Sequence, residues 1–145
     1  MNQNVTIVKE REISAQDTSV WHVLTDQDSI KCWLGVTLET AWREGSEMRF
    51  CFEWGGKSYE DKGKIVEWEP MRTFAYEYWS EFSGTADSPE NYSLVRFTLR
   101  NEQGKTVLHL NHSRIATQKM YESSDQNWEG TLDAIKKLAE EHIAK

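Results

Sequence analysis

The sequence predicts an α+β fold in which a curved antiparallel sheet wraps around a long C-terminal helix. Segments in which apolar and polar residues alternate, as in strands with one buried face, fill the middle of the chain. The last segment changes to helical periodicity. No linker, repeat or low-complexity tract interrupts the 145 residues, so we expect one domain over 1–145. The expected order is a strand, two short helices, six antiparallel strands and a long helix.

The first strand is expected at Val5–Ile13, and its inward face includes two charged residues. That face consists of Val5, Ile7, Lys9, Arg11 and Ile13. A buried charge without a partner costs several kcal/mol, so the two cations need carboxylates. We expect Glu67 and Glu77 to supply them as structural ion pairs. Contact of the cations with a polar ligand head group is the less favoured alternative.

Two short helices are expected next. Ser14, followed three residues later by Asp17, resembles the capping pattern that starts a helix. The first helix is expected to carry its apolar residues inward: Val20, Trp21, Val23 and Leu24. The second is expected over Gln27–Trp33, with Asp26 as its cap and Gly35 at its end.

Six further strands follow from alternation with a period of two. They are expected at Val36–Trp42, Ser46–Trp54, Lys57–Glu69, Thr73–Phe82, Asn91–Arg100 and Lys105–Arg114. Gly55 and Gly56 predict a two-residue hairpin turn between the second and third of these strands. Gly63 indicates a bulge or a close approach of another backbone.

The C-terminal helix is expected over Gln118–Ala144. Its apolar stripe consists of Trp128, Leu132, Ile135, Leu138, Ala139 and Ile143. The inward faces of the strands are the surface that this stripe can cover. A twisted sheet curls, and a straight helix cannot lie flush against it, so we expect a cavity between them. The seven Trp, five Tyr and five Phe residues could fill or line that space.

Composition limits the classes of partner. The net charge is −7 and no basic stripe is present, which argues against binding to nucleic acids or to anionic membranes. No apolar run reaches the roughly 18–20 residues of a membrane span, and the first ten residues are too polar for a secretory signal. Cys32 and Cys51 are therefore expected to be free thiols in the cytoplasm. We expect no cofactor and no metal site, because no phosphate-binding loop, HExxH, GxSxG or paired CxxC motif occurs.

Five segments in this order resemble the START-like (SRPBCC, helix-grip) superfamily, and within it the proteins similar to the activator of the Hsp90 ATPase. The segments are SVWHVLTDQDSIKCW, Gly45 with Met48-Arg49-Phe50, GKIVEWEPMRTFAYEY, VRFTLRNEQGKTVLHLNHS and NWEGTLDAIKKL. Ser46 replaces the second glycine of the usual Gly-Gly pair, and Asn127-Trp128 replaces the usual Gly-Trp. The resemblance is fairly specific for the helix-grip fold. It is poorly specific for function, because the superfamily includes lipid carriers, hormone receptors and cyclases.

His112 is the polar residue of greatest interest. Its strand neighbours Leu108 and Leu110 face inward, so His112 should do the same, and the family often has a histidine at this place. His112 could bind a ligand carbonyl or act as a general base. The favoured alternative to catalysis is a histidine satisfied by a core partner. Glu60 and Asp61 are adjacent and should point to opposite faces, so they form no acid–base pair.

Eight residues are candidates to line a pocket, with plain core packing as the alternative for most of them. They are Trp54, Tyr59, Phe74, Tyr76, Tyr78, Phe97, His112 and Trp128. Tyrosine and tryptophan add single polar atoms to an apolar wall, which suits a ligand with few functional groups.

Three functions remain open. The leading hypothesis is a non-enzymatic carrier or sensor of a small hydrophobic molecule, lipid-like or aromatic. The second is a protein-interaction module resembling the chaperone-ATPase activators, with a chaperone or another protein as partner. The third, least favoured, is a cyclase- or hydrolase-type enzyme that uses His112. The chain could be a monomer or a weak dimer.

Overall fold

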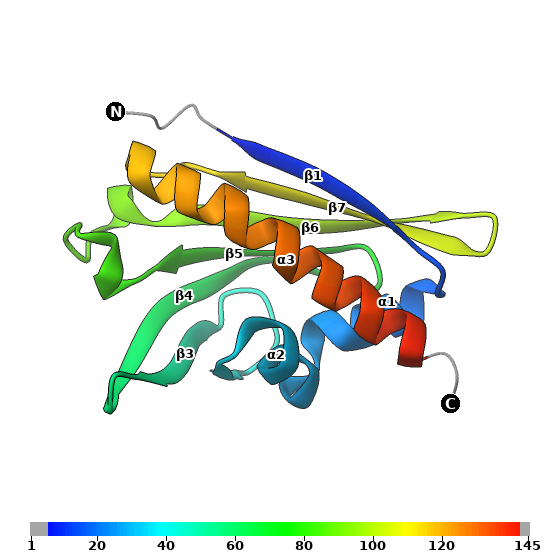
Figure 1. The fold of residues 1–145 in the computed structure, drawn as a ribbon, viewed down its shortest axis with the longest axis horizontal. Helices are drawn as coiled ribbons and strands as arrows, with labels where there is room; N and C mark the ends of the chain where they lie inside the picture. Colours follow the sequence, from blue (N-terminus) through cyan, green and yellow to red (C-terminus); the bar gives the residue numbers. More distant parts are fainter. Residues whose placement is uncertain (1–5, 143–145) are drawn as a thin grey trace.

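The computed structural model describes residues 6–142, and its elements follow the predicted order (Figure 1). They are β1 Ile7–Ile13, α1 Asp17–Thr25, α2 Gln27–Leu34, β2 Thr37–Thr40, β3 Glu47–Trp54, β4 Lys57–Glu69, β5 Thr73–Trp79, β6 Ser93–Glu102, β7 Lys105–Ser113 and α3 Gln118–His142. Two short 3-10 turns, η1 Glu81–Ser83 and η2 Pro89–Asn91, connect β5 to β6. The predicted α+β class and the sheet-on-helix arrangement are confirmed.

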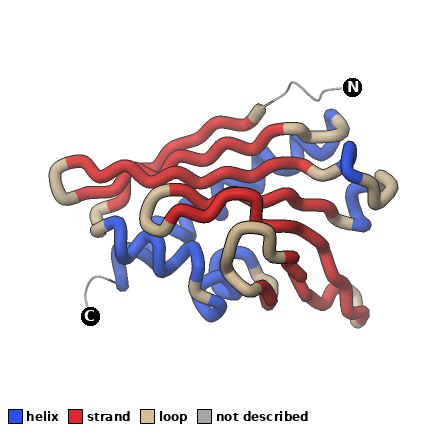
Figure 2. Tube along the Cα trace, turned by 180° about the vertical axis from the view of Figure 1, so that it is seen from behind, coloured by secondary structure: helices blue, strands red, loops and turns tan. Residues whose placement is uncertain are grey.

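The seven strands form one antiparallel sheet in the order β1-β7-β6-β5-β4-β3-β2. The strands after β1 pair with their neighbours along the chain, whereas β1 lies at the edge beside β7. Helix α3 crosses one face of the sheet, and α1 and α2 lie beside the C-terminal half of α3 (Figure 1). Seen from behind, the strands lie in front and the helices lie beyond them (Figure 2).

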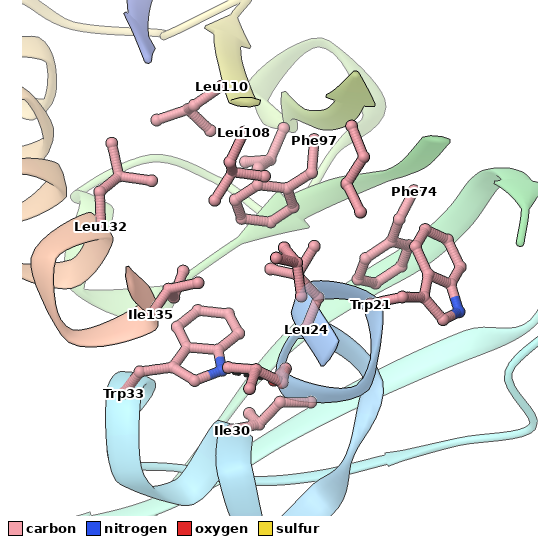
Figure 3. Close-up of a cluster of buried hydrophobic side chains, with 14 of the residues drawn as sticks. Trp21, Leu24, Ile30, Trp33, Phe74, Phe97, Leu108, Leu110, Leu132 and Ile135 are labelled. Atoms are coloured by element: carbon pink, nitrogen blue, oxygen red, sulfur yellow. Dashed lines mark hydrogen bonds between the residues drawn. The ribbon is translucent and has the colours of Figure 1, made fainter. Parts of the chain in front are cut away.

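The core lies between this sheet and the C-terminal half of α3. Leu132, Ile135 and Ala139 are fully buried, and Trp128 is 9% exposed. Side chains from α1, α2, β6 and β7 meet the helix here (Figure 3). Each fully buried aliphatic side chain contributes roughly 1.5–3 kcal/mol. The predicted stripe is therefore the face that packs, although Leu138 is only half-buried and Ile143 lies outside the described residues.

Helix capping agrees with the prediction at α2 and differs at α1. The Asp26 carboxylate accepts a hydrogen bond from the backbone N–H of Ser29 at 3.0 Å, and Gly35 ends α2 in the left-handed conformation. Helix α1 starts at Asp17 behind Gln16, which makes no side-chain cap. The prediction that Ser14 caps α1 was wrong, because the helix begins only at Asp17 and Gln16 occupies the cap position. The backbone N–H of Ser14 donates to Glu140 of α3 at 2.9 Å.

The outer ends of several strands differ from the predicted ranges. The predicted strand Thr73–Phe82 ends at Trp79, because Ser80 caps the η1 turn through a hydrogen bond from the backbone N–H of Phe82. Strand β6 begins later than predicted because Pro89 opens the η2 turn. Strand β2 is shorter than predicted at both ends. The predicted start of the first strand, Val5, lies outside the described residues.

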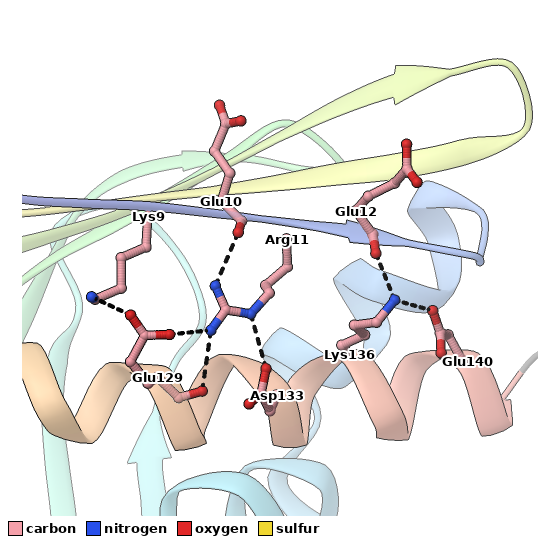
Figure 4. A network of polar contacts seen from close by, with 8 residues as sticks. All are labelled: Lys9, Glu10, Arg11, Glu12, Glu129, Asp133, Lys136 and Glu140. Atoms are coloured by element: carbon pink, nitrogen blue, oxygen red, sulfur yellow. Dashed lines mark hydrogen bonds and ion pairs between the residues drawn. The ribbon is translucent and has the colours of Figure 1, made fainter.

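The prediction that Glu67 and Glu77 neutralise Lys9 and Arg11 was wrong. Glu67 binds Arg96 at 2.9 Å and Glu77 binds Arg114 at 3.2 Å. The two cations of β1 instead bind carboxylates of α3. These are Glu129 and Asp133 (Figure 4), together with Asp125, which binds Lys9. The physical reason is the strand order. Strand β1 pairs with β7 and passes beside α3, three strands away from β5 and four from β4.

The β3–β4 hairpin confirms the predicted turn and sets the register of the inward-facing residues. Gly55 and Gly56 both have positive φ, 62° and 82°, which suits a two-residue turn. Trp54 therefore pairs with Lys57, and the same register continues along both strands. A register shift occurs further along β4, against β5.

Gly63 is placed where another backbone comes close. A Cβ atom there would lie 2.4 Å from the backbone oxygen of Glu77 and 3.1 Å from Cε1 of Phe50. The close approach predicted for this glycine is confirmed. The bulge lies two to four residues further on, between Ile65 and Glu67.

We predict that Gly63→Ala lowers the free energy of unfolding by about 1–3 kcal/mol, because β4 and β5 would have to separate. Gly130→Ala is the matched control. Gly130 lies inside α3 with open space around its Cα, so alanine should raise stability by roughly 0.5–1 kcal/mol. Urea denaturation of both variants measures the two effects. Equal effects of the two substitutions would contradict the packing at Gly63.

Candidate functional site

A cavity of about 360 Å³ lies between the N-terminal half of α3 and the inner face of the sheet. Its sheet wall is mainly aromatic and its helix wall carries smaller polar residues. The sheet wall includes Phe50, Phe52, Tyr76, Tyr78 and Val95, and the helix wall includes Ser124, Asn127, Trp128 and Thr131. Leu34 and Val36, on either side of the end of α2, close one side. The volume falls within the usual range for small-molecule pockets, about 300–1,000 Å³.

The cavity exists because the two halves of α3 differ. In the C-terminal half, large apolar side chains fill the space above the sheet, and the helix contacts β1, α1 and α2. Ser124 in the N-terminal half and Thr131 near the middle of the helix line the cavity at positions where larger residues would close the gap. Trp128 spans part of it and packs edge-on against Phe97, with ring centroids 5.7 Å apart.

His112 faces the cavity but has both ring nitrogens engaged. The indole N–H of Trp128 donates to Nδ1 at 3.0 Å, and Nε2 lies 2.9 Å from the hydroxyl of Ser93. An indole nitrogen can only donate, so Nδ1 carries no proton and Nε2–H must donate to Ser93. Burial lowers the pKa of His112 to about 4, and the imidazole is neutral at pH 7.

Asp61 and Tyr78 form a second polar pair in the wall. Asp61 is 5% exposed, and its Oδ2 accepts a short hydrogen bond from the hydroxyl of Tyr78. Its other oxygen, Oδ1, has no hydrogen-bond partner among the described residues. Burial raises the pKa of Asp61, while the hydroxyls of Tyr78 and Ser80 act in the opposite direction. Burial and then the Asp61 carboxylate raise the pKa of Tyr78.

Four of the eight candidate residues line this cavity: Tyr76, Tyr78, His112 and Trp128. Phe74 and Phe97 lie instead in the solid core, where Phe74 packs against Trp21 and Phe97 against Trp33. These two face inward as expected, but other side chains cover them.

Trp54 and Tyr59 lie beyond the cavity, at the far end of the β3–β4 hairpin. Trp54 is 67% exposed. Both pack against Phe82, with ring centroids 5.8 Å and 4.7 Å apart, and Tyr59 also stacks on Phe52. We call Phe52, Trp54, Tyr59 and Phe82 the exposed aromatic cluster. It adjoins the cavity, because Phe52 belongs to both.

Sequence reasoning missed Asp61, although a signal was present. The Gly55-Gly56 turn fixes the pairing of Phe50 with Asp61, and Phe50 faces inward. Residues directly opposite on paired strands point to the same face, so Asp61 had to point inward as well. The smaller residues of the helix wall carried no such signal.

The described residues contain no group of three or more His, Cys, Asp or Glu side chains arranged to hold a metal ion. Within that same range, no helix is both long and apolar enough to cross a bilayer. Cys32 is exposed and Cys51 half-buried, and neither forms a disulfide.

The buried neutral state of His112 predicts a pH dependence of stability. The pKa is lower in the folded protein, about 4, than its ordinary value of 6.5, so the unfolded chain binds more protons between these values. The stabilisation that comes from the neutral state of His112 is present above pH 6.5 and is lost as the pH falls towards 4. Relative to a His112→Gln variant, the wild type should lose about 2 kcal/mol of unfolding free energy between pH 7 and pH 5.

Urea denaturation at the two pH values measures this difference. Ser93→Ala is the control, since it removes a partner of His112 but keeps the titrating ring. It should lower stability at pH 7 and retain the pH dependence. A wild type and a His112→Gln variant that lose stability in parallel would contradict the neutral buried state.

The chain resembles several solved structures over its whole length. It is 31% identical to the protein ChR145 of Cytophaga hutchinsonii, with a TM-score of 0.83 and coverage of 100% of both chains. The Aha1 dimer of Colwellia psychrerythraea is 21% identical, with a TM-score of 0.74 over 94% of this chain and 96% of that one. CalU16 of Micromonospora echinospora is 23% identical, with a TM-score of 0.72 over 96% of this chain and 78% of that one. The last two show a shared fold.

A comparison with curated protein sequences finds no match. The family model described as activator of Hsp90 ATPase homologue 1-like protein matches residues 14–140, which include all of the helices and strands except the first strand and the last two residues of α3. Together with the fold, this match shows that the chain belongs to the activator of Hsp90 ATPase homologue 1-like family, a member of the START-like superfamily.

Proposed function

We propose that this protein binds a small, largely apolar molecule in the cavity between α3 and the sheet. The observation that carries the proposal is a space of about 360 Å³ beside an otherwise filled core. The wall offers the rings of Phe50, Tyr76 and Trp128. Water is held weakly by such surfaces, so an apolar molecule of matching size gains by replacing it.

The size of the cavity limits the affinity that apolar contact alone can supply. A two-ring aromatic molecule that buries about 250 Å² gains about 6 kcal/mol at roughly 25 cal/mol per Å². The loss of translational and rotational freedom offsets part of this gain. We therefore expect dissociation constants on the order of micromolar to millimolar for simple apolar probes.

The hydrogen bonds that already engage the polar groups of the cavity agree better with ligand binding than with catalysis. A general base needs a free lone pair near the substrate, and Nδ1 of His112 already accepts from Trp128. The hydrogen-bond partners of His112 are Trp128 and Ser93, and neither is an acid or a base near neutral pH. The enzyme hypothesis for His112 would require this network to open first.

We predict that apolar aromatic and lipid-like ligands raise the melting temperature and change the tryptophan fluorescence, because Trp128 forms part of the wall. A ligand at 100 times its dissociation constant should stabilise the fold by about 2.7 kcal/mol. Ser124→Phe should reduce affinity at least about tenfold by filling the cavity. Ser123→Phe is the matched control, since Ser123 is exposed on the same helix. Equal binding by both variants would contradict this site.

A second candidate function is binding to another protein, and the exposed aromatic cluster favours it. Trp54 is 67% exposed and Phe82 is 54% exposed, and they lie beside each other. Large exposed aromatic groups that gather in one place are typical of protein interfaces. The family description names activation of the Hsp90 ATPase, so a chaperone of this type is the partner that we propose for this surface.

We predict that this protein stimulates the ATPase of the Hsp90 from the same organism, and that Trp54→Ser and Phe82→Ser each lower the stimulation at least about tenfold. Val8→Ser is the control, because Val8 is 56% exposed on β1, away from the cluster. ATP turnover measured with purified proteins decides the question. Absent stimulation, or stimulation that Trp54→Ser and Phe82→Ser leave unchanged, would remove this candidate.

A further inference from the structure

We propose that the molecule bound in this cavity carries a hydrogen-bond donor, a hydroxyl or an ammonium group, and that Asp61 accepts it. This inference rests on the proposed binding function and specifies the chemical class of the ligand. It follows from the way in which the polar groups of the cavity wall are already paired with one another.

The first observation is the free oxygen of a buried carboxylate. Asp61 is 5% exposed and lines the cavity. Tyr78 donates to its Oδ2, whereas Oδ1 has no hydrogen-bond partner among residues 6–142. Buried polar atoms are almost always hydrogen-bonded, because leaving one unpaired costs the full loss of its hydration. A donor on the ligand would supply the missing bond.

The second observation is that three of the donors of the inner wall are already in use. The hydroxyl of Tyr78 donates to Asp61, and the indole N–H of Trp128 donates to His112. The remaining N–H of His112 points to Ser93. A ligand carboxylate or carbonyl would therefore find these three donors occupied. The hydroxyls of Tyr76, Ser124 and Thr131 and the amide of Asn127 also line the cavity, and each can donate or accept. The unpaired carboxylate oxygen of Asp61 can only accept, so it is the group that selects a ligand with a donor.

The third observation is the charge of the lining. Two lining residues are acidic, Asp61 and Glu53, and no lysine or arginine lines the cavity in the described part of the chain. A low-dielectric wall strengthens the effect of such charges. An anionic head group would be repelled, a neutral hydroxyl would be accepted, and an ammonium group would also neutralise the Asp61 carboxylate.

The test uses four naphthalene probes that differ at one position: 2-naphthol, 2-(aminomethyl)naphthalene, 2-methoxynaphthalene and 2-naphthoate. Their dissociation constants for the full chain at pH 7 are measured by tryptophan fluorescence and calorimetry. We expect both donors to bind about tenfold more tightly than the methyl ether, and 2-naphthoate to bind most weakly. The comparison of the alcohol with the amine separates hydrogen bonding from charge.

Variants at Asp61 assign the preference to this residue. Asp61→Leu should remove the difference between 2-naphthol and 2-methoxynaphthalene while the ether still binds. Asp61→Asn, which keeps a partner for Tyr78, should retain the preference for the alcohol, lose the preference for the amine and bind 2-naphthoate more tightly than the wild type does. Glu60→Gln is the control and should keep the wild-type order, because Glu60 is adjacent to Asp61 on β4 but does not line the cavity and binds Arg49 instead.

The outcomes separate this inference from the function on which it rests. Equal binding of 2-naphthol and 2-methoxynaphthalene by the wild type would overturn the inference and leave ligand binding intact. A preference for the alcohol that survives in Asp61→Leu would also overturn it, because another group would then be the acceptor. Failure of all four probes to bind would overturn the proposed function and this inference together.

Discussion

The contact between the C-terminal half of α3 and the sheet is the constraint on which the rest of the structure depends. Leu132, Ile135 and Ala139 are fully buried there. Lys9 binds Asp125 and Glu129 in the N-terminal half of α3, and Arg11 binds Glu129 and Asp133, so these ion pairs hold the helix beside β1. Their carboxylates are exposed, so each pair is worth about 0–1 kcal/mol. Large side chains fill the space beneath the C-terminal half, whereas the small side chain of Ser124 leaves space beneath the N-terminal half. The same packing therefore produces both the core and the cavity.

Polar groups beneath the N-terminal half of α3 form two short chains of hydrogen bonds. One runs from Trp128 through His112 to Ser93, and the other joins Tyr78 to Asp61. The first chain is satisfied at every nitrogen, which keeps the imidazole neutral and makes it part of the wall. The second chain ends in a carboxylate oxygen without a partner. The cavity thus combines a largely apolar surface with one unpaired carboxylate oxygen, which agrees with the proposed binding of a ligand that donates a hydrogen bond.

Local patterns in the sequence predict most of the fold. The features that these patterns do not predict depend on contacts between segments that are distant in the sequence. Strand β4 spans the predicted Lys57–Glu69, because a glycine turn and clear alternation set its limits. The cap predicted at Ser14 is absent, because α1 begins only at Asp17, and the N–H of Ser14 binds Glu140, which is distant in the sequence. The carboxylates that neutralise β1 required knowledge of the strand order. Of the site, the inward direction of His112 followed from alternation, but its pairing with Trp128 depends on the position of α3.

The central claim is that real apolar space remains beneath the N-terminal half of α3. Apolar cavities of about 150 Å³ already bind xenon. A crystal of the protein under xenon gas tests the claim directly, since the electron density of the atom needs no chosen ligand. The account predicts a xenon site bounded by Phe50, Tyr76 and Trp128. Crystals without xenon there, in which the aromatic side chains of the sheet pack directly against α3 and fill the gap, would contradict it.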